Sequence, residues 1–174
     1  MDERTERFRR VFDACYQPLH AYARRRCSAA DAEDLVAEVL TVGWRRLDDV
    51  PAEAPLPWLF GVARRCLANQ RRGADRRLRL LRRLACEPVA VTWPTASGGD
   101  DAVLDTLARL RPDDREVLRL ATWEQLAIAE IAVVLGCTPN AAAIRLSRAR
   151  RRFREQLTQR AGSRTELARK DADA

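Results

Sequence analysis

Several residue types are scarce in this chain of 174 residues. It contains one lysine, one histidine and seven glycines, and its aromatic fraction is 6%. The shortage of glycine argues against a glycine-rich β architecture. The single histidine, and the lack of a phosphate loop, a G-x-S-x-G motif or a metal-ligand cluster, argue against an enzyme. We therefore expect a binding function, with no catalytic residue, no metal site and no cofactor.

Long apolar runs and paired cysteines are also missing. No run approaches the roughly 18–20 apolar residues of a membrane span, and residues 1–4 are too charged for the start of a signal peptide. The five cysteines are widely spaced without a CxxC pair, which argues against a zinc site or a disulfide framework. We expect a cytoplasmic protein that does not insert into a membrane and keeps its cysteines reduced.

Arginine is abundant, and its distribution is uneven. It supplies 31 of the 32 basic residues, and the net charge is +7. Residues 28–56 contain seven acidic residues and two arginines, residues 64–83 contain nine arginines and one acidic residue, and residues 145–154 contain six arginines and no acidic residue. One acidic block and two basic blocks predict more than one kind of partner.

Hydrophobic periodicity predicts an all-α fold of two small helical domains joined by a flexible linker, the second being a helix-turn-helix domain. Prolines, a Ser-Gly-Gly sequence and the loss of helical period place the linker at residues 86–100. The domains are then residues 1–85 and 101–160, followed by a flexible tail over 161–174. The expected helices cover residues 3–26, 30–47, 57–84, 102–110, 112–123, 125–135 and 139–157, with a proline-rich loop over 48–57.

The helix-turn-helix is predicted from the residues around its turn. Gly136 follows an apolar stripe and suits a helix end, Thr138 suits an N-cap, and Pro139 suits the first helical position. The next helix has apolar residues spaced by four and three, which predicts one buried stripe. These residues are Ala142, Leu146, Ala149, Phe153 and Leu157.

Opposite that stripe, Ile144 lies among Asn140, Ser147, Arg148 and Arg151. An isoleucine on a polar face suits docking into a DNA major groove, where it can meet a thymine methyl group. Arginines at the flanks would meet phosphates. These are Arg145, Arg150, Arg152 and Arg154. The alternative is a solvated, arginine-rich helix that happens to follow a turn.

Two surfaces of the first domain also suit partners. Asp34 and Glu38 are like charges at i, i+4, an arrangement that costs a few tenths of a kcal/mol and fits either a basic partner or simple solvation. On the following helix, Arg65, Asn69 and Arg72 share one flank. That flank suits the nucleic-acid backbone or a strand pulled from the duplex, and the alternative is again a solvated face.

In this order, these features resemble the extracytoplasmic-function group of bacterial RNA polymerase sigma factors. The matching segments are 31–40 with Trp44 and Arg45, 57–64, 110–118, 130–132, 135–137 and 145–150. The resemblance implies a protein that binds core RNA polymerase and directs promoter-specific transcription initiation.

The resemblance also implies three sets of site residues. Contacts with the clamp helices of the largest polymerase subunit would come from Asp34, Leu35, Glu38, Val39, Leu40 and Trp44. The minus-ten element would be handled by Arg64, Arg65, Asn69, Arg71 and Arg72. The minus-thirty-five element would be read by a recognition helix through Thr138, Asn140, Ala143, Ile144, Arg145, Ser147, Arg148 and Arg151.

The implied partners are core RNA polymerase, through its clamp helices and its flap, and promoter DNA. We also expect an anti-sigma factor that covers the Asp34/Glu38 face. The resemblance places this protein at the nucleoid in the cytoplasm. Gln125 and Ala127 stand where the family often has glycine and serine, so we expect no side-chain cap from Ala127 on the first helix of the motif.

Two alternatives stay open at this point. An ordinary helix-turn-helix regulator with an N-terminal dimerisation domain would self-associate and bind a palindrome without polymerase. An adaptor related to anti-sigma factors would bind polymerase but not DNA, and would not need the basic block at residues 145–154.

Overall fold

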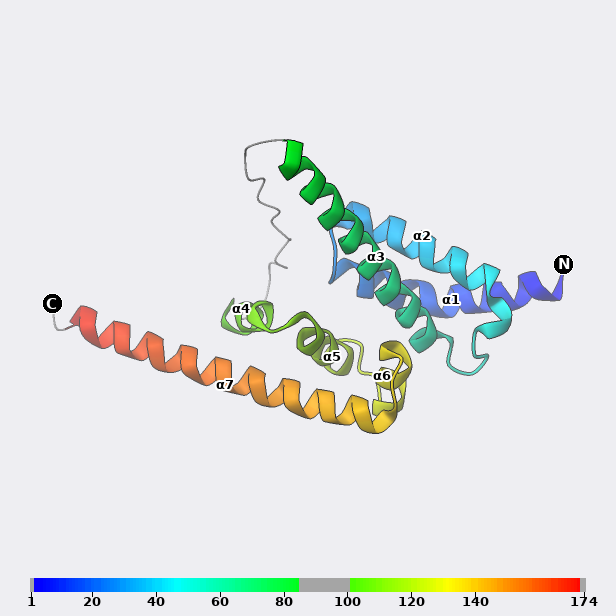
Figure 1. The fold of residues 1–174 in the computed structure, drawn as a ribbon. Helices are drawn as coiled ribbons and strands as arrows, with labels where there is room; N and C mark the ends of the chain where they lie inside the picture. Colours follow the sequence, from blue (N-terminus) through cyan, green and yellow to red (C-terminus); the bar gives the residue numbers. More distant parts are fainter. Residues whose placement is uncertain (1, 85–100, 173–174) are drawn as a thin grey trace. The chain divides into compact units, whose positions relative to one another are not determined.

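The computed structural model describes residues 2–84 and 101–172 (Figure 1). In these ranges the chain is helical without any strand, which confirms the all-α prediction. The elements are α1 (Glu3–Arg24), α2 (Ala29–Arg45), the short 3-10 helix η1 (Leu47–Asp49), α3 (Pro55–Leu84), α4 (Asp101–Arg109), α5 (Pro112–Thr122), α6 (Ile128–Leu135) and α7 (Pro139–Ala172). The predicted linker, residues 86–100, lies outside the described residues.

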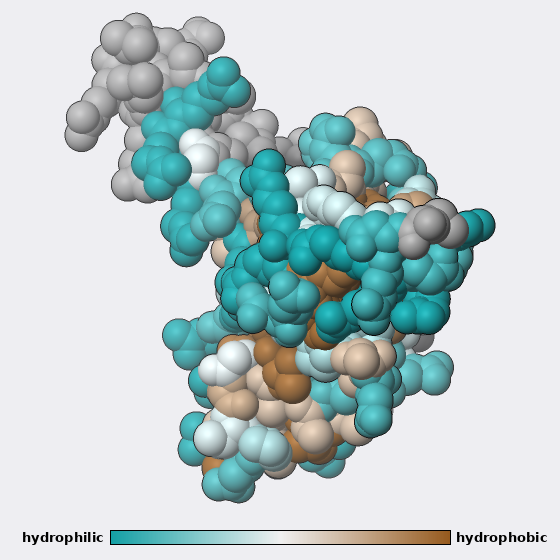
Figure 2. Space-filling model, turned by 90° about the vertical axis from the view of Figure 1, so that its right-hand side faces the viewer, coloured by the Kyte–Doolittle hydropathy of each residue, from teal (hydrophilic) through white to brown (hydrophobic). Residues whose placement is uncertain are grey.

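The chain forms two compact units. The first contains α1, α2 and α3, and the second contains α4, α5, α7 and most of α6. Hydrophilic residues cover the upper and middle part of the face seen in Figure 2, and apolar residues gather in its lower part. No single helix among the described residues is both long and apolar enough to cross a membrane, and α6 with the first part of α7 reaches that composition only as a bent pair.

The core of the first unit lies where α1, α2 and α3 pack against one another. Tyr22 and Phe60 are buried and stack with ring centroids 4.6 Å apart, joining α1 to α3. A Cβ atom at Gly43 would lie 3.3 Å from Cδ2 of Leu59, so the glycine permits the close approach of α2 and α3. Apolar residues at helical spacing therefore supply the interior of this unit.

The connection between α2 and α3 lies two residues earlier in the chain than the sequence predicts, because α2 ends at Arg45 instead of residue 47. The expected loop over 48–57 begins with η1, and α3 starts at Pro55 instead of residue 57. Proline has a φ angle suited to the first helical turn and lacks only an N–H that would find no partner there. For this reason Pro55 and Pro57 both fit inside the start of the helix.

The second unit is built on α7, which contacts α4 and α5. Ala142, Leu146 and Ala149 are buried, as the predicted stripe requires, whereas Phe153 and Leu157 are half-buried. The predicted end of this helix near residue 157 is wrong, because α7 continues to Ala172. The segment after residue 160 has no proline and several good helix formers, which allows the helix to propagate.

Candidate functional site

The predicted helix-turn-helix is present in α6 and α7, whose axes bend by 97° across a short break. Such an angle is typical of the motif. Gly136 has a φ of +63°, a left-handed conformation that suits glycine after a helix. Pro139 is the first residue of α7, and the Thr138 hydroxyl oxygen accepts a hydrogen bond from the Ala141 N–H at 3.2 Å. The predicted turn chemistry is therefore confirmed.

The start of α6 differs from the prediction. The helix begins at Ile128 instead of residue 125, and Gln125 has a φ of +53°. Ala127 provides no side-chain cap, but its N–H donates to Oε2 of Glu130 at 2.7 Å. This is the second half of a capping box, in which a glutamate three residues on accepts from the N-cap. Glu130 was missed, although its spacing from Ala127 could have revealed it.

All eight residues predicted for the recognition helix and its cap are exposed. Ile144 is 43% exposed, and it is one of the few large apolar side chains at that level. The buried stripe faces the interior of the second unit, so the arginine-bearing side of α7 faces away from that interior. An exposed isoleucine between polar side chains is the arrangement that direct base reading requires.

The arginines beside this face do not all behave alike. Arg145, Arg150 and Arg154 are exposed, as expected for phosphate contacts. Arg152 instead pairs with Asp114 of α5, with Nη1 2.9 Å from Oδ1 and 2.7 Å from Oδ2. The prediction that Arg152 meets phosphate is therefore wrong in this fold, because its guanidinium is already used to hold α5 and α7 together.

The acidic helix α2 separates its predicted polymerase contacts into two groups. Asp34 and Glu38 are exposed on the outer side. Leu35, Val39 and Leu40 are buried in the core of the first unit, so their predicted direct contact with polymerase is wrong for this fold. Their spacing places them on the inner face, where they support the helix that displays the two carboxylates.

Trp44, the last predicted contact on α2, is half-buried. Its ring meets Phe8 edge to face with centroids 5.2 Å apart, and the guanidinium of Arg4 lies 5.1 Å from the ring centroid. Both neighbours come from α1. The structure therefore gives Trp44 packing partners within the first unit and leaves it half-buried.

Glu38 is linked to α3. Gln70 donates through Nε2 to Oε2 of Glu38 at 3.3 Å. Burial, a hydrogen bond to Glu38 and the charge of Glu38, in that order, raise the pKa of the Cys66 thiol to about 11. The four cysteines in the described part of the chain are free.

The predicted minus-ten residues lie along α3. Arg65, Asn69, Arg71 and Arg72 are exposed and Arg64 is half-buried. Arg72 donates through Nη2 to Oδ1 of Asn69, which joins two of the predicted residues. Arg65, Asn69 and Arg72 therefore share one exposed flank of α3, and Arg64 and Arg71 lie on a different side of the same helix.

The second unit carries a helix-turn-helix with an exposed basic face. The first unit displays one acidic helix and one basic helix. Together these features define a DNA-binding protein with a second surface for a protein partner. Residues 11–77 match the family described as Sigma-70 region 2, and residues 100–153 match Sigma-70 region 4. Both matches contain the candidate surfaces of their units.

Individual relatives agree with these matches. The chain is 34% identical over 143 residues to RNA polymerase sigma factor CarQ of Myxococcus xanthus, covering 78% of this chain and 79% of CarQ. It is 30% identical over 163 residues to the ECF RNA polymerase sigma factor SigL of Mycobacterium tuberculosis, covering 86% and 88%.

A solved structure gives the same result. The sigma factor RpoE of Bartonella quintana, determined in complex with the anti-sigma factor NepR, matches with a TM-score of 0.66 and 28% identity over 87% of this chain and 96% of RpoE. The chain belongs to the extracytoplasmic-function group of RNA polymerase sigma factors. It is a polymerase-binding factor for promoter-specific initiation, and a helix-turn-helix regulator that acts without polymerase is excluded.

Proposed function

We propose that the two units divide the work of promoter recognition. Residues 1–85 bind core polymerase and handle the minus-ten element, residues 101–160 read the minus-thirty-five element, and residues 86–100 link them. The protein acts as a specificity subunit without catalytic activity of its own, in the cytoplasm at the nucleoid. The exposed, arginine-flanked face of α7 with Ile144 at its centre is the observation that carries the proposal.

The minus-thirty-five element is read by the exposed face of α7. Asn140, Ser147 and Arg148 can form hydrogen bonds with base edges, and Ile144 can contact a thymine methyl group. Arg145 lies at the edge of this face, where phosphates pass, and Arg151 lies on the face itself, one turn beyond Ser147. Thr138 caps the helix by accepting from the Ala141 N–H. Pro139 has no N–H, and the Asn140 N–H at the start of the helix can meet a phosphate.

The minus-ten element is handled by α3. Arg65, Arg71 and Arg72 supply positive charge along its exposed side, and Asn69 adds an amide that can meet a base. Release of counterions from the DNA favours binding to such a row of arginines. Arg64 lies on the same helix at half exposure and supports the row.

Core polymerase and an anti-sigma factor compete for the acidic side of α2. Asp34 and Glu38 present two carboxylates to a basic partner, here the clamp helices of the largest subunit, and the half-buried Trp44 lies near the end of the same helix. RpoE of Bartonella quintana was solved bound to an anti-sigma factor. A similar regulator of this chain would silence it by covering the Asp34/Glu38 face.

The polymerase flap binds the second unit. A cavity of about 320 Å³ lies between α4, α5 and α7, lined by Val103, Leu107, Leu118 and Phe153, with Trp123 and two arginines beside them. Trp123 is 39% exposed. An apolar cavity with an accessible aromatic side chain suits an apolar segment of a protein partner.

Run-off transcription with purified core polymerase on a library of genomic promoters tests the proposed function. The parent protein should give promoter-dependent transcripts and bind core. Ile144→Arg should change the preferred minus-thirty-five sequence while core affinity stays the same, because the change is confined to the exposed face of α7. At the base pair that Ile144 contacts, the preference of the parent for its own base over another should fall by about tenfold.

Thr158→Arg is the matched control. It adds the same charge to an exposed position of the same helix, about 21 Å further along at 1.5 Å per residue, and should leave the promoter preference unchanged. If Ile144→Arg lowers core affinity and keeps the promoter preference, the reading face has been assigned wrongly. If the parent yields no promoter-dependent transcript with active core, the proposed function fails altogether.

A further inference from the structure

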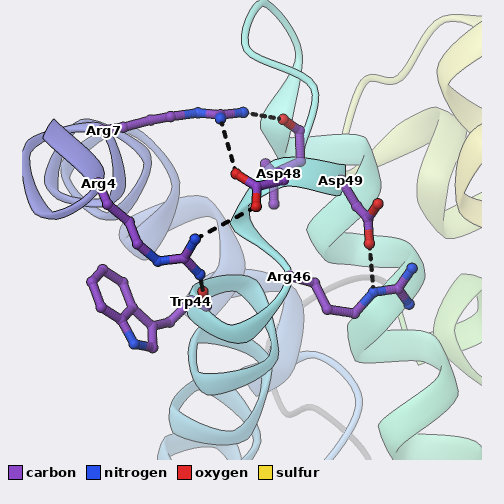
Figure 3. Close-up of polar contacts among 7 residues, drawn as sticks. Arg4, Arg7, Trp44, Arg46, Asp48 and Asp49 are labelled. Carbon is purple, nitrogen blue, oxygen red and sulfur yellow. Dashed lines mark hydrogen bonds and ion pairs between the residues drawn. The ribbon is translucent and has the colours of Figure 1, made fainter.

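Two arginines at the start of α1 hold the connecting loop between α2 and α3, which is defined here as residues 46–54. Figure 3 shows both side chains reaching across to this loop. Arg4 donates through Nη2 to the carbonyl oxygen of Trp44 at 2.7 Å, and Arg7 donates through Nη2 to the carbonyl oxygen of Val50 at 2.9 Å. The two accepting carbonyls lie on either side of η1, one in the last turn of α2 and the other within the loop.

The two acceptors differ in kind. The Trp44 carbonyl belongs to the last turn of α2, where helix carbonyls have no partner within the helix and attract cations. Val50 is buried at 2% exposure and ends η1, so its carbonyl fixes the point where the chain turns outward. An arginine on each carbonyl sets the direction in which residues 51–54 leave the core.

Asp48 lies between the two guanidinium groups. Its carboxylate oxygens are 3.6 Å from Nη1 of Arg4 and 3.8 Å from Nη1 of Arg7, and its side chain is 86% exposed. Ion pairs so exposed add little stability by themselves. Their effect is to place positive charge beside an acidic loop, which otherwise would repel the phosphates of a DNA strand.

A third arginine completes the arrangement from inside the loop. Arg46 pairs through Nε with Asp49 at 2.8 Å, and its guanidinium lies 5.8 Å from the ring centroid of Trp58 on α3. Both aspartates of η1 therefore face guanidinium groups, as the labelled side chains of Figure 3 show.

We propose that Arg4 and Arg7 are positioning residues for promoter opening, which hold the connecting loop in the conformation that receives the minus-ten strand beside α3. This inference rests on the proposed function of the first unit. Both residues precede residue 11, where the match to Sigma-70 region 2 begins, so the family match assigns them no role. Their role follows from the contacts with Trp44, Asp48 and Val50.

The test compares the Arg4→Ala/Arg7→Ala double variant with the parent, each as the full chain bound to core polymerase. Permanganate reactivity of thymines in the minus-ten element measures opening. Initiation rates on promoters that differ by one base pair in that element measure discrimination. Promoter opening, measured as permanganate reactivity, should fall about tenfold or more, because two charge-assisted hydrogen bonds are lost. The initiation rates on the promoters that differ by one base pair should become more alike. The thermal midpoint should fall by several degrees, because the same hydrogen bonds stabilise the first unit, and the variant should still fold and bind core polymerase.

Arg9→Ala/Arg10→Ala is the matched control, since it removes two exposed arginines from the same helix. Its net charge equals that of the Arg4→Ala/Arg7→Ala variant. It should open the promoter like the parent. Arg4→Lys/Arg7→Lys keeps both charges without the guanidinium fork and secures the test if the alanine variant folds poorly. It should fold, bind core and still show reduced opening and narrowed discrimination.

The inference is overturned if the lysine variant matches the parent in promoter opening and in discrimination between promoters. It is also overturned if Arg9→Ala/Arg10→Ala loses as much promoter opening as Arg4→Ala/Arg7→Ala. Each comparison requires that the parent opens the promoter with core polymerase. If the parent fails to do so, the proposed function is refuted instead, and the two failures are distinguished in the same experiment.

Discussion

The pairing of Asp114 with Arg152 predicts how firmly the recognition helix is held. Asp114 is in the first turn of α5, and Arg152 lies in the second half of the basic block on α7. The two oxygens of Asp114 accept from Nη1 of Arg152 at 2.7 and 2.9 Å. Their side chains are 12% and 39% exposed, so the carboxylate is the more deeply buried partner. We expect substitutions at the two positions to cost unequal free energies.

The magnitude follows from what each substitution leaves behind. Removal of one partner of a buried pair costs about 3–5 kcal/mol when the other is left without solvent. Asp114→Ala leaves an arginine that water can reach, and we therefore expect the free energy of unfolding to fall by about 2 kcal/mol. Arg152→Ala leaves a buried carboxylate without its guanidinium and should cost about 3 kcal/mol.

Native-state hydrogen exchange on the full chain measures these losses, because it reports on the second unit separately from the first. Backbone amides in the buried first part of α7 should exchange about thirtyfold faster in Asp114→Ala, and faster still in Arg152→Ala. Arg151→Ala is the control: its pair with Glu155 spans 3.6 Å, with both side chains more than half exposed, and should cost less than about 0.5 kcal/mol. Equal, small effects at positions 114, 151 and 152 would refute the reasoning.

Two further predictions follow from the backbone and from a thiol. Gln125→Gly should raise the free energy of unfolding by about 1 kcal/mol in denaturant titrations, because a non-glycine residue at a φ of +53° is strained. A lower free energy of unfolding would mean that a contact of the Gln125 side chain stabilises the protein by more than the backbone strain costs. Because its pKa is raised to about 11, the Cys66 thiol should be alkylated slowly at pH 8 and about tenfold faster for each pH unit up to that value, as mass spectrometry can follow. Of the four cysteines in the described residues, Cys137, which is half-exposed at the helix-turn-helix, should be alkylated first, and an equal rate at Cys66 at pH 8 would contradict its burial.

The local features of this protein follow from its amino-acid sequence. Helical periodicity placed Leu35 and Val39 on an inner face and Ile144 on an outer one, because side chains three or four residues apart share a helix face whatever the rest of the chain does. Gly136, Thr138 and Pro139 determined the turn for an equally local reason, since their backbone angles and hydrogen bonds involve only neighbours along the chain. The two candidate DNA-binding faces and the acidic helix were therefore readable in advance.

Only the tertiary structure decided which arginines are available. In the sequence, Arg151 and Arg152 stand side by side in one basic block, yet one is exposed while the other grips Asp114, a residue 38 positions away. Arg4 and Arg7 reach carbonyls 40 and 43 positions away, and their spacing on α1 does not reveal this. A side chain with five donors finds whichever acceptors the packing of helices brings near. That choice depends on how the helices of each unit are packed, which periodicity along a single helix does not specify.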